Sequence, residues 1–556
     1  MNCKGRSVTE RDKKMKSLLK FRGKIFPLSR FAPVLFTLAV FTVYTYFSGW
    51  CLCQQVDDML VIAVMEKLPH TLSSFLFTRD WFYPYGVRLS DGFDLNIAPS
   101  IVGNLLFPVL GDWVLTQRVT AALFLLATAL SMYYAVRSVY GDAYGAGIGA
   151  TAFAFSNYFV MRTPSHLSLL GGFVFPLGMI CLVKKKSLCL GLVMGLAYWC
   201  SPFYGLALPM LAALYGVYEL LTGEQKARDV AKRYVFSIAL LMLMILPFIP
   251  SSSKRHEYYM CNTVTDLLLR HERALIASSS SSGNWEATAA YLGLSTVVLA
   301  AVSSLRRRRE RFTWFLVSVA LIFAVLSFSP IPLFPFDSFR ATARFAVVSL
   351  FVLSFLSGGT FSGLRINRMK RVPLAGVALV AIVVDTLVVA PPWFTGPPPF
   401  HWDDPGYSVI RGDESAVAQI HFPIMVSDVG LMYYQYYGVL TGKKVVDAQT
   451  SALYRHELMD STYWNIFFLR QFLVSDTINK FALEYAESAF KELPSSLDFW
   501  TLRSWGVDYI VLHRFLYGPI GRTEEAIEYL NKIENLGWIS QVYISDQISI
   551  YKVTIS

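Results

Sequence analysis

Residues 31–58 read FAPVLFTLAVFTVYTYFSGWCLCQQVDD. They begin with an apolar stretch from Phe31 to Trp50 and end with the acidic pair Asp57 and Asp58. About 20 apolar residues suffice to cross the hydrocarbon core of a bilayer, so the stretch predicts a membrane-spanning helix. The two carboxylates would then lie at the mouth of the membrane, on a side that the rest of the chain defines.

The composition indicates a membrane protein. Of the 556 residues, 54% are hydrophobic and 16% are charged, and the mean hydropathy is +0.44. Soluble globular domains carry about 25% charged residues. The net charge of +11 does not indicate a nucleic-acid partner, because the basic residues lie in short clusters between apolar runs. Membrane topology explains such clusters better.

Apolar runs continue along most of the chain and predict a polytopic α-helical membrane protein of about 11 spans. They lie near residues 31–50, 113–136, 143–160, 167–183, 187–201, 203–221, 234–250, 287–304, 312–329, 344–362 and 373–391. We see no convincing internal repeat among them.

The basic clusters set the expected topology, because lysine and arginine in short loops mark the cytoplasmic side. They lie at the N-terminus and at residues 137, 184–186, 226–233, 306–311 and 365–371, all on one predicted side. Residues 1–30 are therefore expected in the cytoplasm. The first run is too long for a signal-peptide core and no cleavage pattern follows it, so it predicts an uncleaved anchor. The cell membrane is favoured over the endoplasmic reticulum.

These features divide the chain into three parts. Residues 1–30 form a basic cytoplasmic segment, and residues 31–391 form the membrane domain with a long outer loop at 51–112. Residues 392–556 follow a proline-rich exit and form a soluble, non-cytoplasmic α/β or α+β domain. Its expected strands are 416–426, 444–448, 507–512 and a terminal hairpin of 542–543 with 548–553; its expected helices are 498–504 and 524–534, ended by Gly506 and Gly537.

Acidic residues of the first outer loop are candidates for catalysis. Asp57 and Asp58 could take the proton of an attacking hydroxyl, or bind Mg²⁺ or Mn²⁺, which prefer oxygen ligands. On position alone, an ordinary acidic pair in a loop is the favoured interpretation. Asp91 and Asp94 form a second acidic cluster in the same loop and are candidates for binding the substrate, although a turn held by aspartate side chains is the favoured explanation.

Basic residues on the outer side are candidates for binding phosphate. Arg162 and His166 lie between two spans, although a lone loop histidine is more often simply solvated. Arg340 and Arg344 are spaced to share one helix face directly before a span, and arginine forks bind phosphate well. Contact with lipid headgroups is an equally weighted explanation. Asp385 lies near the outer end of the last span, where an acid is either functional or reaches the interface.

The cysteines show no metal-ligand spacing. Cys51, Cys53 and Cys261 fall on the expected outer side, and a disulfide between two of them is left open by the sequence.

Short motifs in a consistent order resemble the GT-C superfamily of multi-pass glycosyltransferases, in its large group of poorly characterised bacterial and archaeal members. The carrying segments are Gln55–Asp58, Phe82–Gly86 with Asp91, Phe153–Tyr158 leading to His166, Glu286 with Tyr291–Gly293, Arg340 with Ala343–Phe345, and Trp505–Leu512. Each motif is short, and their order covers nearly the whole chain.

The resemblance implies a GT-C-like fold and transfer of a sugar from a polyprenyl-phosphate donor on the non-cytoplasmic face. It implies an acidic residue of the first outer loop at the acceptor, often with a divalent metal, and Asp57 or Asp58 matches that position. The chain lacks the Trp-Trp-Asp signature of oligosaccharyltransferases, which argues against transfer of a whole glycan to asparagine. The expectation is an inverting hexosyl- or pentosyltransferase in which Arg162, His166, Arg340 and Arg344 hold the phosphate.

Two other functions stay open at this point. A lipid or glycan transporter would show repeats and broken spans in matching halves. A non-catalytic assembly or cell-surface protein would keep the fold and use its outer domain to bind a partner. Fold alone does not decide among the three.

Overall fold

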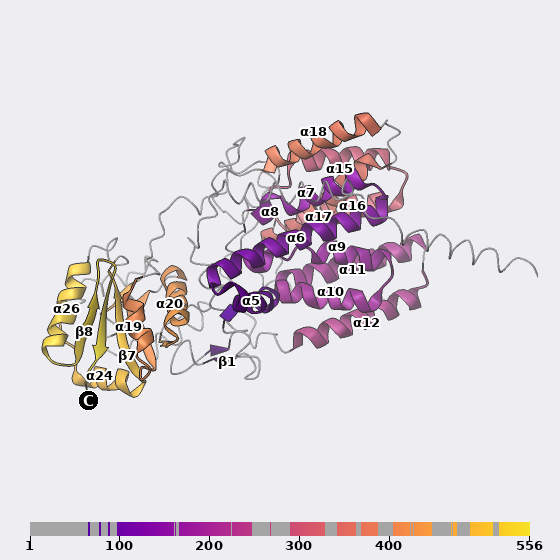
Figure 1. Ribbon diagram of the computed structural model, residues 1–556. Helices are drawn as coiled ribbons and strands as arrows, with labels where there is room; N and C mark the ends of the chain where they lie inside the picture. The colour runs from indigo at the N-terminus through magenta and orange to yellow at the C-terminus, as the bar shows by residue number, and fades with distance from the viewer. Residues whose placement is uncertain are drawn as a thin grey trace, which may run out of the picture.

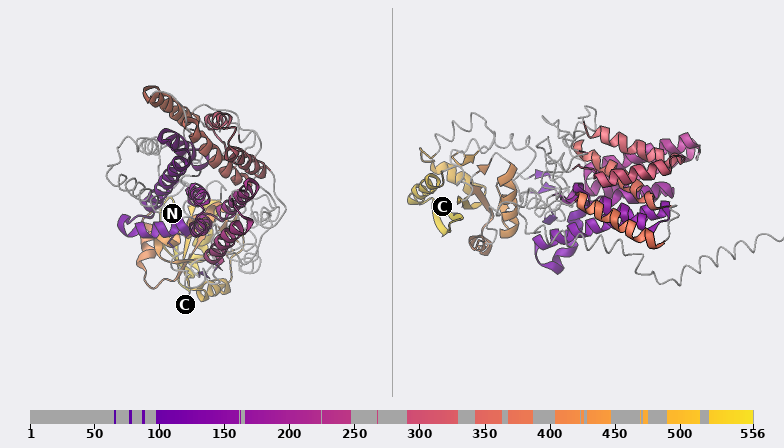
Figure 2. Two further views of the ribbon diagram at one scale, coloured as in Figure 1. Left: turned by 90° about the vertical axis from the view of Figure 1, so that its right-hand side faces the viewer. Right: turned by 90° about the horizontal axis from the view of Figure 1, so that it is seen from above.

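The computed structural model describes residues 97–160, 166–223, 225–246, 290–328, 342–362, 368–386, 404–422, 428–446, 490–514 and 522–555, with short pieces at 65–66, 77–78, 87–88, 162, 267, 424–425, 469 and 471–474. They form a helical bundle and, at one of its ends, a domain built on a β-sheet (Figure 1). The views in Figure 2 show the same two parts, with the sheet domain beyond the end of the bundle.

Helices coincide with each apolar run from residue 113 onward, whereas the run at 31–50 lies outside the described residues. Three helical stretches of the described chain, Trp113–Tyr140, Pro202–Thr222 and Thr342–Phe361, are long and apolar enough to cross a membrane. The number of spans stays a prediction. The bundle comprises α6 (Trp113–Tyr140), α7 (Ala143–Ala154), α8 (Asn157–Val160), η3 (Leu167–Leu170), α9 (Val174–Val183), α10 (Ser187–Cys200), α11 (Pro202–Thr222), α12 (Ala227–Ile245), α15 (Leu294–Arg306), α16 (Arg311–Leu326), η6 (Thr342–Phe345), α17 (Ala346–Gly358), η7 (Gly359–Phe361) and α18 (Arg368–Thr386).

Local signals in the sequence set where the first long helices begin and end. Asp112 accepts a hydrogen bond from the Leu115 amide at 2.6 Å and starts α6, and Gly141, at a φ of 71°, ends it. Asp142 then caps α7 in the same way, through the Gly145 amide at 2.7 Å. An acidic N-cap satisfies an amide that the helix leaves unpaired, so α6 and α7 form a tight hairpin.

Small residues let α7 and α17 pack backbone against backbone. A Cβ on Gly145 would lie 2.0 Å from the carbonyl oxygen of Gly358, and a Cβ on Gly149 would lie 2.9 Å from that of Ser354. Close approach over small residues is a usual way for membrane helices to gain packing energy. This contact places α17, which is buried nearly all round, at the centre of the bundle.

Charged groups meet at the end of the bundle away from the sheet domain. Arg371 forms an ion pair with Asp142 at 2.6 Å, and the Arg307 guanidinium lies 4.6 Å from the ring centre of Tyr140. Between α11 and α12, Arg233 pairs with Glu219, and both side chains are buried. The gathering of these arginines at one end agrees with the charge pattern, although the side of the membrane on which they lie stays a prediction.

Helix α5 (Ile97–Leu110) was not expected, because its residues lie within the segment 51–112 that was predicted as a long loop. Its 14 residues are too few to span a bilayer, which is why hydropathy did not single it out. Its end is joined to α6 by stacking of Phe107 on Trp113, with ring centres 4.0 Å apart.

The sheet domain has three layers. Its sheet has the order β5-β3-β7-β9-β8, in which β5, β3 and β7 are parallel and β9 is antiparallel to both of its neighbours. Helices α24 and α26 cover one face, and α19 and α20 cover the other. The elements are α19 (Gly406–Gly412), β3 (Ala418–Phe422), α20 (Asp428–Thr441), β5 (Lys444–Val445), α24 (Ser496–Ser504), β7 (Val507–His513), α26 (Thr523–Asn535), β8 (Ile539–Ile544) and β9 (Ile548–Val553), with two-residue pairs β1 (Phe77–Thr78) with β2 (Val87–Arg88) and β4 (Ile424–Met425) with β6 (Leu473–Val474).

The expected strands, helices and terminal hairpin of this region are therefore present, and Gly506 and Gly537 follow α24 and α26 at a φ of 77° each. Helices α19 and α20 were not expected. The placement of this domain on the non-cytoplasmic side stays a prediction.

Two histidines are buried between the sheet and α20. Nδ1 of His421 on β3 lies 2.8 Å from Nε2 of His513 on β7, and both side chains have no exposed surface. The His421 ring stacks on Tyr434 with ring centres 4.8 Å apart. Burial, with the proximity of His513, holds the pKa of His421 well below 6.5, and burial lowers the pKa of His513 to about 3. The pair is therefore uncharged at neutral pH.

The sheet domain and the bundle share a small core. Val114, in the first turn of α6, belongs to the same buried cluster as Tyr407 and Ile410 of α19, and Trp113 packs against it. The N-terminal end of α6 therefore lies beside the α19–α20 face of the sheet domain (Figure 1).

Candidate functional site

The connection between α7 and α9 carries two of the predicted phosphate-binding residues. Local backbone hydrogen bonds fold it into α8 and η3, including Arg162 N to Phe159 O at 3.1 Å and His166 N to Arg162 O at 2.9 Å. Gly172, at the end of the connection, packs directly against Phe159. A Cβ there would lie 2.2 Å from the Phe159 ring. Arg162 and His166 are thus held in one compact segment.

Arg162 is fully buried, which is unusual for an arginine. Its guanidinium carbon lies 3.8 Å from the ring centre of Tyr158, and Nη1 donates to the Tyr158 carbonyl oxygen at 3.1 Å. The ring face attracts the cation and the carbonyl orients it. His166, four residues later, is partly buried. The sequence identified both residues, and the structure adds Tyr158 as the platform of the arginine.

The first turn of α11 brings a second basic segment to this connection. The Tyr204 hydroxyl donates to the Leu169 carbonyl at 2.5 Å, and it lies 3.5 Å from the Tyr158 hydroxyl. The neighbouring Phe203 packs on Phe345, with ring centres 4.6 Å apart. Phe345 follows Arg344 in η6, and Arg344 is partly buried. The segments of Arg162 and Arg344, far apart in sequence, therefore pack on adjacent residues of α11.

No family model and no curated protein matches the chain. Solved structures do match it. Arabinofuranosyltransferase AftD from Mycobacteria has 15% identity and a TM-score of 0.58, over 96% of this chain and 40% of that one. Archaeal oligosaccharyltransferase AglB from Archaeoglobus fulgidus has 13% identity and a TM-score of 0.50, over 87% of this chain and 69% of that one.

A third structure is matched over almost its full length. ArnT from Cupriavidus metallidurans, bound to undecaprenyl phosphate, has 12% identity and a TM-score of 0.50, over 93% of this chain and 98% of that one. The chain has the GT-C fold. The resemblance found in the sequence is thereby confirmed for the fold, while this chain spans only 40% of the length of AftD. At such identities a shared fold does not determine the reaction, which depends on the residues of the site.

Within the GT-C bundle, Asp385 has a structural role. Its Oδ1 accepts from the Tyr291 hydroxyl at 2.8 Å, and its Oδ2 accepts from the Ser295 amide at 2.7 Å. The Tyr291 hydroxyl in turn accepts from the Leu294 amide at 2.8 Å. Asp385 therefore caps the N-terminal end of α15, which accounts for both the buried acid and the Tyr291–Gly293 motif.

The remaining predicted site residues lie outside the described residues. These are Asp57, Asp58, Asp91, Asp94 and Arg340, and the same holds for Cys51, Cys53 and Cys261. Among the described residues, no group of three or more His, Cys, Asp or Glu side chains could hold a metal ion. The roles expected of these residues, including binding of Mg²⁺ or Mn²⁺, stay predictions.

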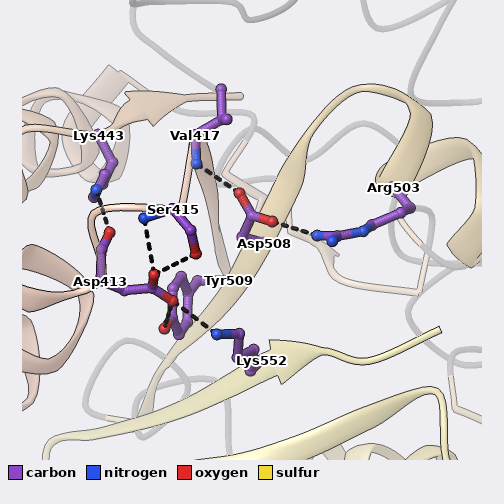
Figure 3. Close-up of polar contacts among 8 residues, drawn as sticks. All are labelled: Asp413, Ser415, Val417, Lys443, Arg503, Asp508, Tyr509 and Lys552. Carbon is purple, nitrogen blue, oxygen red and sulfur yellow. Dashed lines mark hydrogen bonds and ion pairs between the residues drawn. The ribbon is translucent and has the colours of Figure 1, made fainter. Parts of the chain in front are cut away.

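Two residues of the Trp505–Leu512 motif, Asp508 and Tyr509, hold the loop before β3 in place (Figure 3). Asp508 accepts from the Val417 amide at 2.6 Å and from Arg503. Next to it, Asp413 accepts from Lys552 and from the Tyr509 hydroxyl at 2.7 Å each.

The contact with Lys552, followed by those with Ser415 and Tyr509, holds the pKa of Asp413 well below its usual range. Together, the acceptors of Figure 3 tie the segment 413–417 to one end of the interior strands β7 and β9.

Proposed function

We propose that this protein is a membrane glycosyltransferase that moves a sugar from a polyprenyl-phosphate carrier to an acceptor on the non-cytoplasmic face. The observation that carries the proposal is the packing of the Arg162 and Arg344 segments on one turn of α11 within a GT-C fold. Two similar structures were solved with lipids of the matching class, AglB with a dolichol-phosphate and ArnT with undecaprenyl phosphate.

The reaction is a single displacement with inversion. A hydroxyl oxygen of the acceptor attacks the anomeric carbon of the sugar, and the bond from that carbon to the phosphate oxygen breaks. The lipid phosphate leaves with the electron pair, so negative charge grows on it in the transition state. Arg162 and Arg344, with His166 and Arg340, would stabilise that charge, because preorganised cations act where charge develops.

The proton of the acceptor goes to a carboxylate of the first outer loop. Asp57 or Asp58 is proposed for this role, since a base must lie within hydrogen-bond reach of the proton that it takes. A Mg²⁺ or Mn²⁺ ion held by the same two carboxylates would orient the acceptor and favour its deprotonated form. Aspartate oxygens suit such hard cations.

The test is a transfer assay in membranes with radiolabelled polyprenyl-phosphate hexoses and pentoses. We expect wild type to transfer at least one label and the Asp57→Asn/Asp58→Asn variant to transfer none. Arg344→Gln should lower the rate about 100-fold, as the loss of one stabilising group commonly does. Arg307→Gln is the matched control, because it makes the same arginine-to-glutamine change at the opposite end of the bundle.

No transfer from any donor by wild type would sink the proposal and favour the non-catalytic assembly role. Full transfer by the double aspartate variant would remove the base from the mechanism.

A further inference from the structure

Asn157 is a buried amide with no hydrogen-bond partner for either Nδ2 or Oδ1, and its side chain has no exposed surface. It is the first residue of α8. Its neighbour Ser156 is satisfied, since its hydroxyl donates to the Phe153 carbonyl at 2.8 Å. Its other neighbour is Tyr158, whose ring lies under the guanidinium of Arg162. The unpaired amide is thus one residue from the platform of the buried arginine.

Leaving such a group unpaired is unfavourable. A buried donor or acceptor without a partner costs about 1–3 kcal/mol, and a membrane interior offers little water to replace the missing bond. A leucine at this position would keep the number and branching of the side-chain heavy atoms and would avoid that cost. Because this amide adjoins the Tyr158 platform of the buried Arg162, it points to a ligand that supplies its hydrogen bonds.

The chemistry of an amide restricts that ligand. The NH₂ group donates and the carbonyl oxygen accepts, so full satisfaction needs a group that does both. Phosphate oxygens without protons only accept, and they would leave Oδ1 unpaired. Sugar hydroxyls donate and accept, and a pair of neighbouring hydroxyls can satisfy both ends of the amide.

We propose that Asn157 binds hydroxyl groups of the sugar carried by the lipid-linked donor, next to the phosphate held by Arg162. This inference rests on the proposed function and deepens it, because it assigns the sugar and the phosphate of one donor to adjacent residues of α8 and its following turn. Asn157 is closed to solvent in this structure, so the side chains around it move apart when the sugar enters.

The test compares two ligands on the full chain in nanodiscs. One is polyprenyl phosphate, and the other is the same lipid bearing a hexose or pentose; binding is measured by native mass spectrometry. In Asn157→Leu, we expect affinity for the sugar-bearing lipid to fall about 30-fold, as two lost hydrogen bonds predict. Affinity for polyprenyl phosphate should stay within twofold of wild type, and the melting temperature should stay equal or rise.

Gln435 provides a matched control. It is likewise fully buried, and neither atom of its amide has a hydrogen-bond partner, but it lies on α20 in the sheet domain. Gln435→Leu should leave both affinities unchanged.

Three results would overturn the inference: equal loss of both ligands in Asn157→Leu, no loss of either, or a lower melting temperature, which would give the amide a structural role. If Asn157→Leu selectively loses binding of the sugar-bearing lipid while wild type transfers no sugar, the inference is supported and the proposed glycosyltransferase activity is refuted. Failure of wild type to bind any sugar-bearing lipid would refute both.

Discussion

Acidification should destabilise the sheet domain through its buried histidine pair. The neutral state of His513 is favoured by folding, because burial lowers its pKa from 6.5 to about 3. The unfolded chain therefore binds more protons than the folded chain below pH 6.5, and stability falls as pH falls through that range. At pH 5 the pKa of His513 in the unfolded chain lies 1.5 units above the pH of the solution. At about 1.4 kcal/mol per unit, the free energy of unfolding is therefore lower by about 2 kcal/mol than above pH 6.5.

His421 changes stability in the same direction, since its pKa is also lowered by burial. The stabilisation is complete above pH 6.5 and is lost on the acid side. The measurement is hydrogen exchange of β3 and β7 in the full chain at pH 7 and pH 5, corrected for the intrinsic exchange rate. We expect protection to fall at least 30-fold.

The matched variant carries His421→Leu with His513→Leu, which replaces both partners of the hydrogen bond by apolar groups. Its protection should not depend on pH in this range. Equal protection of the wild-type strands at pH 7 and pH 5, or the same loss in the double variant, would refute the reasoning.

Three further outcomes are expected. Gly145→Ala should lower the melting temperature, because its Cβ would lie 2.0 Å from a carbonyl oxygen of α17, whereas Gly376→Ala, with no atom within 4 Å, should not; equal melting curves would contradict this. Arg233→Leu should cost about 3–5 kcal/mol by leaving Glu219 charged and buried, with much of the loss recovered when Glu219→Leu is added; chemical denaturation of the two variants decides. Asp385→Leu should loosen the start of α15 by removing its cap, seen as faster hydrogen exchange there, and unchanged exchange would count against a capping role.

The sequence predicted the helices of the bundle because a long apolar run has few alternatives. It failed where helices are short or mixed. Helix α5 is a mostly apolar helix of only 14 residues, and its segment was predicted as part of a loop. Helix α20 contains Tyr433, Tyr434, Tyr436 and Tyr437, residues with β-propensity, and becomes helical while the rings of Tyr434 and Tyr437 stack on the buried His421.

The roles of the candidate site residues stay predictions, but the structure shows how two of their segments come together. Charge and position indicated Arg162 and Arg344 as residues of one face. Their shared contact with α11 depends on packing between segments far apart in the chain, which no local pattern encodes. The role of Asp385 as a helix cap was missed because its partners, Tyr291 and Ser295, lie about 90 residues away.

Helix α6 connects the two ends of the bundle. Its first turn is embedded in the core of the sheet domain, and its last residue, Tyr140, lies among the arginines of the opposite end. Its 28 residues correspond to a rod of about 42 Å, with no proline within it to bend it. One helix therefore links the α19 side of the sheet domain to the basic end of the bundle, so a change at either end of α6 acts on both parts.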